Sequence, residues 1–313
     1  MARTAANALA RRRWSRLRAH RTLTAWGFLL GPLLLFGVIF LFPAFRVVHL
    51  STLQSQLFRP EAFVGFGNYQ RLFEDPLFWK SLRITAIWSI GVVPAVIAIA
   101  LPLALVLNTQ WLKAKGLWRL VFFLPVVTNI VAAAFVWRWL FDPQFGVVNY
   151  GLGLLGLPRP AWLAVPGWAL AAMMIVAVWK QVGQAMVLFL AGLQTIPKEF
   201  EEAAAIDGAN PWQMFRHVTL PLLNPTIVFV AAILLINAFR VFTIPFVMSA
   251  GGLTHRTVGG PLDSTRLYVL HLYDWTFSRF DFGYGAATAV VLLVVVVTLT
   301  LVQTKLLSRP FEY

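Results

Sequence analysis

The chain has 313 residues, of which 59% are hydrophobic and only 12% charged, and its mean hydropathy is +0.74. A soluble domain of ordinary composition carries about 25% charged residues, so this composition excludes an ordinary soluble domain. The chain has no cysteine, which excludes disulfides, thiolate metal sites and thiol catalysis. The net charge of +14 and the pI near 11.0 would indicate nucleic-acid binding in a soluble protein, but they have a different explanation here.

The apolar residues form long blocks without acidic or basic side chains. Such blocks cover residues 22–45, 84–112, 120–137, 217–239 and 282–304, and a sixth, 160–197, is interrupted only by Lys180. A helix needs about 20 apolar residues to cross the hydrocarbon layer. The sequence therefore predicts an all-α integral membrane protein with about six transmembrane helices. We place these spans approximately at 24–45, 82–107, 117–140, 166–193, 223–248 and 282–306.

The N-terminal tail carries the orientation signal. Seven of the 26 basic residues precede the first span: Arg3, Arg11, Arg12, Arg13, Arg16, Arg18 and Arg21. Basic residues next to a span mark the cytoplasmic side and favour anionic lipid. We therefore expect a cytoplasmic tail at 1–23, a transmembrane domain at 24–313, and both termini inside. A secretory signal peptide is the other interpretation, but the apolar run at 22–45 is longer than a usual signal core of 7 to 15 residues.

Two local expectations concern helix shape. Asn68 precedes a short segment at 69–73 and is expected to cap a helix there. Pro94, Pro102 and Pro125 lie within spans, where each removes a backbone hydrogen bond and can kink its helix. The second and third spans are therefore expected to bend.

The segment 194–222 differs from the rest of the chain because it holds four of the twelve acids, between Glu199 and Asp207. Acids in a first turn and an alanine run favour one short helix that ends at Gly208. Asn210 and Gln213 form a capping-box pattern for a second helix, which Pro221 is expected to end. These residues allow two interpretations, a docking element on the cytoplasmic face or an amphipathic hairpin on the bilayer surface.

The run Glu202-Ala203-Ala204, followed by Gly208 and then by Val218, Thr219, Leu220 and Pro221, resembles the EAA loop of ABC importer permease subunits. Flanking runs are similar to the carbohydrate-uptake, maltose-type branch: 190–197, 205–209, 219–223, 63–69, 145–149 and 259–261. The resemblance implies the type I importer fold, with 24–313 as permease domain and 194–222 as the loop that couples to an ATPase. It implies this coupling role for Glu202, Ala203, Ala204, Asp207 and Gly208.

The resemblance also implies partners. They are a homologous second permease, two copies of a cytoplasmic ATPase subunit and an extracytoplasmic binding protein, in the cytoplasmic membrane of a bacterium or an archaeon. No G-x-x-x-x-G-K-[ST] phosphate loop occurs in the sequence, so ATP and magnesium are expected on the ATPase partner and no cofactor on this chain. No nucleic acid is expected as a partner.

Polar side chains within spans are costly and are default candidates for a transport pathway. Lys180, Gln181 and Gln184 share one face of the fourth span, and Asn237 and Arg240 share a face of the fifth. In the resembling permeases the sugar contacts lie on these two helices. That correspondence implies contacts at Lys180, Gln181, Gln184, Leu234, Asn237, Ala238 and Val241.

Two alternatives stay open at this point. The polar groups could instead be interhelical hydrogen-bond partners, and the two cations would also suit an anionic cargo such as glycerol phosphate. A membrane-embedded enzyme is a weaker hypothesis, because H-E-x-x-H is absent and the five histidines have no ligand spacing. A channel or secondary transporter would need a repeat or a coupling-ion site, and the acid-free spans indicate neither.

Overall fold

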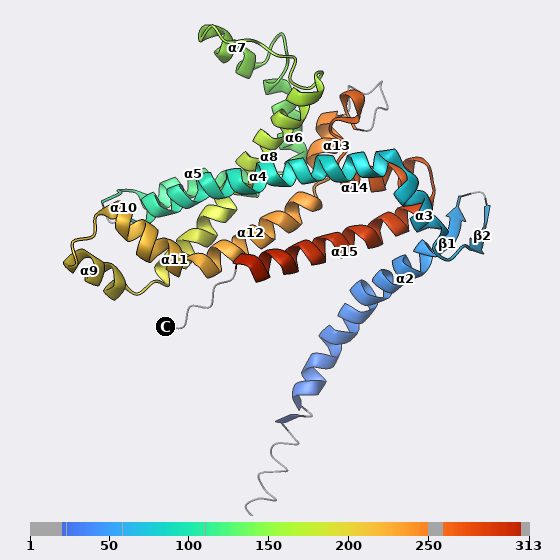
Figure 1. Cartoon of the computed structure of the whole chain (residues 1–313), viewed down its shortest axis with the longest axis horizontal. Coiled ribbons are helices and arrows are strands. Elements are labelled where there is room, and N and C mark those ends of the chain that lie inside the picture. Colours follow the sequence, from blue (N-terminus) through green and yellow to red (C-terminus); the bar gives the residue numbers. More distant parts are fainter. Residues whose placement is uncertain (1–20, 23, 58, 110, 250–258, 308–313) are drawn as a thin grey trace, which may run out of the picture.

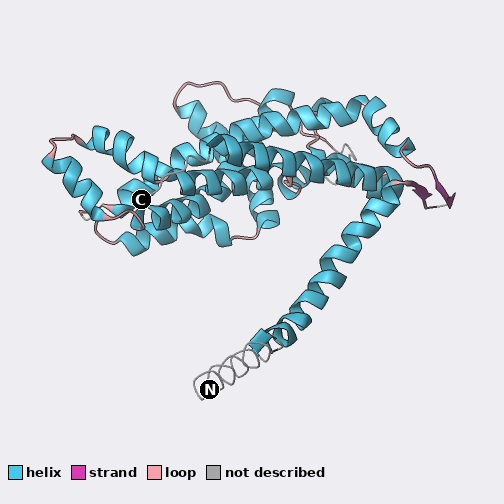
Figure 2. Cartoon of the chain, turned by 60° about the horizontal axis from the view of Figure 1, so that its bottom comes forward, coloured by secondary structure: helices cyan, strands magenta, loops and turns pink. Residues whose placement is uncertain are grey.

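The computed structural model describes residues 21–307 except residues 23, 58, 110 and 250–258. The basic residues from Arg3 to Arg18 therefore lie outside the described residues. Helices make up most of the described chain, and one antiparallel hairpin, β1 (Leu53–Gln56) with β2 (Arg59–Phe63), extends from one end (Figure 2). Leu53 pairs with Phe63 and Gln54 with Ala62, with an irregularity before Gln56 pairs with Arg59.

The fold class is confirmed. Four helices are long and apolar enough to cross a membrane, namely Thr24–Ser51, α4 (Pro76–Asn108), α8 (Pro166–Gln194) and α15 (Phe282–Leu307). Two bent helix pairs raise the number to six if each pair is one span. They are α5 (Lys115–Val127) with α6 (Ile130–Leu140), bent by 96°, and 211–222 with α12 (Asn224–Phe239), bent by 67°.

Shorter elements connect these spans. They are α3 (Gly67–Glu74), α7 (Val147–Leu154), α9 (Lys198–Ile206), α10 (Pro211–Met214), η2 (Phe215–Thr219), α11 (Leu220–Leu222), α13 (Thr243–Ser249), η3 (Pro261–Asp263), α14 (Tyr268–Tyr273) and η4 (Asp274–Ser278).

The first helix stands away from the rest of the chain. Its apolar window is entirely unburied, and only its last part, α2 (Phe42–Ser51), packs on α15 (Figure 1). A π-helical stretch, η1 (Gly37–Leu41), lies in the middle of this helix. An apolar helix without neighbours in its own chain must be covered by lipid or by another protein.

The core lies where α4, α8 and α12 meet. Trp88, Met173 and Phe189 are fully buried there. α8 also approaches α5 closely at Gly183, because a Cβ at this position would lie 2.2 Å from the backbone oxygen of Phe122. Small residues at such crossings let helix backbones touch, and close packing rather than water exclusion then holds membrane helices together.

The bends lie only partly where the prolines predicted them. α4 continues through Pro94 and Pro102 as one helix, whereas α5 ends two residues after Pro125. Pro221 does not end its helix, contrary to expectation, because the helix continues to Leu222 and bends at Leu223. The π-helical stretch η2 ends at Thr219, two residues before Pro221. The wider turn of a π-helix relieves the contact between a proline ring and the preceding carbonyl.

The expectation for Asn68 is wrong. α3 begins at Gly67 without any side-chain cap, and Asn68 is buried instead. Its amide nitrogen donates to the backbone oxygens of Ser51 (2.9 Å) and Leu53 (2.8 Å). The side chain therefore satisfies carbonyls at the turn from α2 into β1, where no helix can supply partners.

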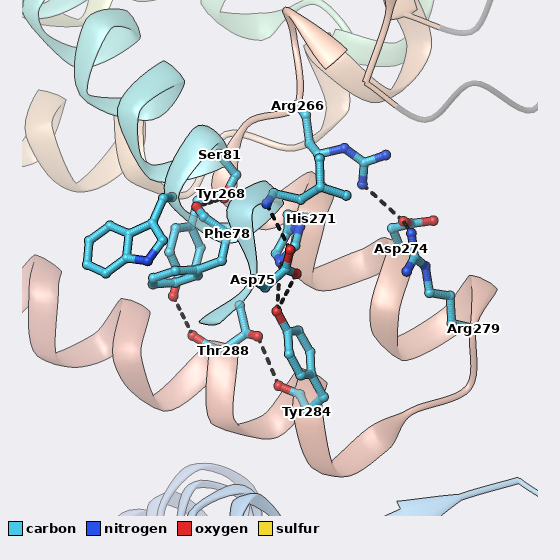
Figure 3. A network of polar contacts seen from close by, with 12 residues as sticks. Asp75, Phe78, Ser81, Arg266, Tyr268, His271, Asp274, Arg279, Tyr284 and Thr288 are labelled. Carbon is cyan, nitrogen blue, oxygen red and sulfur yellow. Dashed lines mark hydrogen bonds and ion pairs between the residues drawn. The ribbon is translucent and has the colours of Figure 1, made fainter. Parts of the chain in front are cut away.

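A cluster of polar side chains, which we name the α14 cluster, holds α14 and η4 between α4 and α15 (Figure 3). Tyr284 donates its hydroxyl to Asp75, the cap of α4, at 2.7 Å. Arg266 pairs with Asp263 (2.8 Å) and with Asp274 (3.0 Å). Further members are His271, whose Nε2 lies 3.8 Å from Asp75, and Tyr268, Arg279 and Thr288.

His271 in the α14 cluster has an unusual protonation equilibrium. Burial lowers the pKa of His271 to about 4; Asp75 and Asp274 act to raise it, and Arg266 and Arg279 act to lower it further. The imidazole is therefore neutral at neutral pH.

This shift predicts that acid destabilises the protein. The unfolded chain binds a proton near pH 6.5, whereas folded His271 stays neutral down to about pH 4. The free energy of unfolding should therefore fall as the pH decreases from about 6.5 to about 4, and this residue contributes at most about 1.4 kcal/mol per pH unit. Thermal unfolding of the detergent-purified protein between about pH 7 and pH 5 tests this, and His271→Gln should flatten the slope. An identical slope in the variant would contradict the assignment.

Candidate functional site

Helical structure is interrupted at two places near the same part of α8. One separates α5 from α6 at Thr128 and Asn129, and the other separates α12 from α13 at 240–242. A cavity of about 380 Å³ lies between them. Its walls are Trp88, Ile130, Ala177, Lys180, Gln181, Asn237, Arg240, Val241, Phe242, Thr243 and Ile244. In a membrane protein, non-helical backbone is tolerated where it lines such a cavity or is buried in protein.

The cavity brings together part of the predicted pathway. Five predicted residues line it: Lys180, Gln181, Asn237, Arg240 and Val241. Three do not. Gln184 is exposed and lies one helical turn further along α8, whereas Leu234 and Ala238 are buried in the packing of α12.

Lys180 holds the first interruption in place. Its ammonium group donates to the backbone oxygens of Pro125 (2.6 Å), Val126 (3.2 Å) and Thr128. The last carbonyls of a helix have no partner within that helix, and a cation near a helix C-terminus is also favoured by the helix dipole. Lys180 therefore has a structural role at the end of α5 in addition to lining the cavity.

The opposite side of the interruption has its own contacts. The side chain of Asn129 caps α6 by accepting from the backbone N–H groups of Val131 (2.9 Å) and Ala132 (3.3 Å). Arg138 at the other end of α6 donates to the backbone oxygen of Val247 in α13 at 3.2 Å. The two interrupted spans are thus joined to each other on one side of the cavity.

Asn237 and Arg240 lie at the end of α12 and are exposed. Within the described residues, neither side chain has a hydrogen bond or an ion pair. The helices around the cavity also offer no acidic partner, since none occurs in α4, α5, α6, α8, α12 or α13. The Arg240 guanidinium is therefore available to a ligand, unlike the Lys180 ammonium.

Sequence reasoning missed the cavity residues outside the α8 and α12 faces. Trp88 comes from α4, Ile130 from α6, Phe242 from the interruption before α13, and Thr243 and Ile244 from the start of α13. A weak signal for α4 existed, because Ser81, Thr85 and Ser89 repeat every four residues and mark its buried face.

The predicted coupling loop, 194–222, folds into α9 and then a second helical segment of α10, η2 and α11, at one end of the molecule (Figure 1). Gly208 ends α9 with a φ of +78°, and Asn210 and Gln213 form the predicted capping box. No residue of α9 is buried. Glu202, Ala203, Asp207 and Gly208 are exposed and Ala204 is half-buried.

Residues 92–311 match the family described as binding-protein-dependent transport system inner membrane component. The chain belongs to this family of permease subunits. It is therefore a transport subunit of a membrane complex rather than an enzyme, and a multi-pass membrane protein.

The sequences of known permeases align with most of this chain. The sulfoquinovosyl glycerol permease SmoG of Agrobacterium fabrum is 35% identical over 82% of this chain and 81% of its own length. The lactose permease LacF of Rhizobium radiobacter is 34% identical over 84% and 86%. The trehalose/maltose permease MalF of Thermococcus litoralis is 34% identical over 78% and 81%.

Solved structures agree in fold. A chain of the bacterial alginate ABC transporter, crystallised with an alginate-bound periplasmic protein, superposes with a TM-score of 0.79. The match covers 91% of this permease and 94% of that chain at 22% identity. The permease thus has the type I ABC importer fold.

The contacts of Lys180 predict a stability effect. Lys180→Met keeps a side chain of similar length but removes the donor that the α5 carbonyls share. Hydrogen bonds to charged groups contribute about 1.5–3 kcal/mol to stability. The thermal midpoint of the detergent-purified permease should fall by several degrees, at about 2–4 °C per kcal/mol. Lys305→Met, at an exposed lysine near the end of α15, is the control and should change little. Equal midpoints for the two variants would refute the structural role.

Proposed function

We propose that this permease moves a carbohydrate across the cytoplasmic membrane of a bacterium or an archaeon by alternating access, driven by separate ATPase subunits. The observation that carries the proposal is the polar-lined cavity between two interrupted spans in a chain of this family. Sugar sites combine polar groups for hydroxyls with aromatic or apolar surfaces for ring faces. The amides of Gln181 and Asn237 and the ring of Phe242 supply both. The names of the lactose and trehalose/maltose relatives support the same cargo class.

In this proposal the loop 194–222 docks in an ATPase subunit. Glu202, Ala203, Ala204, Asp207 and Gly208 form the contact, and closure of two ATPase copies moves the loop and the spans attached to it. Exposed apolar side chains in the loop support a docking role, since Ile206 is 87% exposed and Trp212 64% exposed. Apolar groups of this size on a surface mark interaction sites when they gather in a patch.

The remaining partners follow from the same scheme. A homologous second permease would cover the unburied first helix, Thr24–Ser51, and a binding protein would deliver cargo from outside. The periplasmic protein in the alginate transporter complex supports that delivery. We place the tail 1–23 in the cytoplasm and assign 24–313 to the permease domain.

The direct test is uptake by the reconstituted complex. Proteoliposomes with this permease, its partner permease and the ATPase subunits should accumulate radiolabelled lactose, maltose or trehalose when ATP and loaded binding protein are present. The permease alone should neither hydrolyse ATP nor accumulate sugar. Sugar-independent ATP hydrolysis by the complex, with no uptake of any of these sugars, would overturn the proposal.

Gly208 provides a test of the coupling loop. Its φ of +78° is costly for a β-branched residue, with strain of about 1–3 kcal/mol, so Gly208→Val should reorient α9. We expect about tenfold less ATPase subunit to co-purify with the variant permease, because 1.4 kcal/mol is a factor of ten. Gly156→Val is the matched control. Gly156 also has a positive φ, +68°, with open space around it, but it lies after α7. Equal ATPase recovery with both variants would count against the docking role.

An anionic carbohydrate or glycerol phosphate is a second candidate cargo, favoured by Arg240, which lines the cavity and has no hydrogen bond or ion pair within the described residues. Arg240→Gln keeps a polar side chain but removes the charge. For an anionic cargo, this variant should slow uptake of glycerol 3-phosphate about tenfold or more, since charge-assisted hydrogen bonds are about twice as strong as neutral ones. Uptake of a neutral sugar such as maltose should change little. No uptake of glycerol 3-phosphate by the unaltered complex would exclude this phosphate as cargo.

A further inference from the structure

An apolar groove lies between α4, α5 and α8 and shares no lining residue with the polar cavity. Its volume is about 750 Å³, and its walls contain no charged, amide or hydroxyl side chain. Three of the residues that line it, Ile99, Val121 and Ile175, are 45%, 51% and 44% exposed, so the groove opens on the outside of these helices. Water needs polar partners to occupy such a space. The groove is therefore suited to an apolar occupant.

The length of the groove suits an acyl chain. Gly91, Ala95, Ile99 and Leu103 line it from α4 and repeat every four residues, so they form one stripe along this helix. At about 1.5 Å per residue, the stripe is about 18 Å long. One leaflet of a bilayer contributes about half of the hydrocarbon layer of about 30 Å. The groove is therefore long enough to hold an acyl chain of one leaflet along α4.

Positive charges gather at one end of this groove. The connection 109–114 joins α4 to α5, which form two of its walls, at the end of the molecule that also holds α10 (Figure 1). Lys113 lies in this connection, and Lys115 and Arg119 share one face of α5 with Phe122, which lines the groove. Within the described residues, none of these three cationic side chains has a hydrogen bond or an ion pair. The sequence of α4, α5 and the connection contains no acid that could compensate them.

An anionic phospholipid combines an acyl chain with a negative phosphate, and basic pockets between membrane helices bind such headgroups. We propose that one anionic phospholipid occupies this groove, with an acyl chain along the α4 stripe and its phosphate on Lys113, Lys115 and Arg119. Charge complementarity favours this occupant over a helix of a second permease, because helix ends on the cytoplasmic side are usually basic and these three cations would repel them. The inference rests on the orientation proposed above, in which the connection 109–114 is cytoplasmic.

Photolabelling tests the site directly. The importer complex is reconstituted in phosphatidylcholine vesicles that contain a small amount of phosphatidylglycerol with a photoreactive acyl chain, or of phosphatidylcholine with the same chain. After irradiation, mass spectrometry locates the label along the permease. We expect the phosphatidylglycerol probe to label groove residues such as Ile99 and Val121 about tenfold more than the phosphatidylcholine probe, equivalent to about 1.4 kcal/mol.

Two double variants separate this site from a general attraction of anionic lipid, to which the basic N-terminal tail is expected to contribute. Lys113→Gln combined with Lys115→Gln removes two charges at the groove. Lys198→Gln combined with Lys305→Gln is the matched control, because it removes two charges from exposed lysines that do not line the groove. The first variant should lose about tenfold in groove labelling by phosphatidylglycerol, and the control should lose none.

Ala95→Phe tests the apolar part of the site, because it places a ring in the groove without changing any charge. Ala98→Phe is its matched control, since Ala98 is exposed on the same helix but does not line the groove. We expect about tenfold less labelling near Val121 in Ala95→Phe and unchanged labelling in Ala98→Phe.

Three outcomes would contradict the proposal. Equal labelling of the wild-type groove by the two probes would show that a negative headgroup is not required. Equal losses in the two double variants would show an effect of net charge alone. Loss of the ATPase subunit from the Lys113→Gln, Lys115→Gln complex, with lipid labelling unchanged, would assign these lysines to the ATPase contact instead.

Labelling does not require transport, so the two proposals fail separately. Sugar uptake by an importer whose groove is not labelled would contradict the lipid site and leave the proposed function standing. A groove labelled as expected in an importer that takes up no sugar would contradict the proposed function alone.

Discussion

A break in a helix inside an apolar layer exposes backbone carbonyls and N–H groups that lipid cannot satisfy, and each unsatisfied group costs several kcal/mol. This permease contains such a break at the α5–α6 turn, and the ammonium group of Lys180 supplies donors to three of the carbonyls there. Asn129 satisfies N–H groups on the other side. These two side chains therefore stabilise the backbone at the sharp 96° turn beside the cavity.

The same requirement explains the polar residues elsewhere in the fold. Asn68 satisfies carbonyls at the turn after α2, and Arg138 satisfies one in α13. In the α14 cluster, Tyr268 donates its backbone N–H to Thr85 at 2.8 Å and its hydroxyl to the backbone oxygen of Thr288 at 2.9 Å. Polar side chains thus support the irregular backbone that gives an otherwise apolar chain its shape.

The contrast between apolar spans and the polar side chains at their interruptions explains what the sequence could predict. The all-α membrane class and the estimate of about six spans follow from hydropathy, and the capping box at Asn210 follows from local pattern. The type I importer fold was implied only by the resemblance of the EAA loop. The position of Lys180 and Gln181 beside one cavity was predictable, because a polar face on an apolar helix is visible in the sequence. Gln184 was included because residues four apart share a face, but it lies one turn along α8, beyond the cavity. Trp88 was missed because an aromatic residue in an apolar run carries no signal until the packing of α4 is known.

The contact at Gly183 also bears on how the cavity can change shape. With no side chain between Gly183 and the Phe122 carbonyl, and with Lys180 bound to the carbonyls that follow, α8 and α5 are fixed to each other at two levels. Packed cores rearrange between discrete states rather than deform continuously, so we expect these two helices to move together. The turn from α12 into α13 has no lysine contact of this kind within the described residues, and α13 is tied instead to α6 through Arg138.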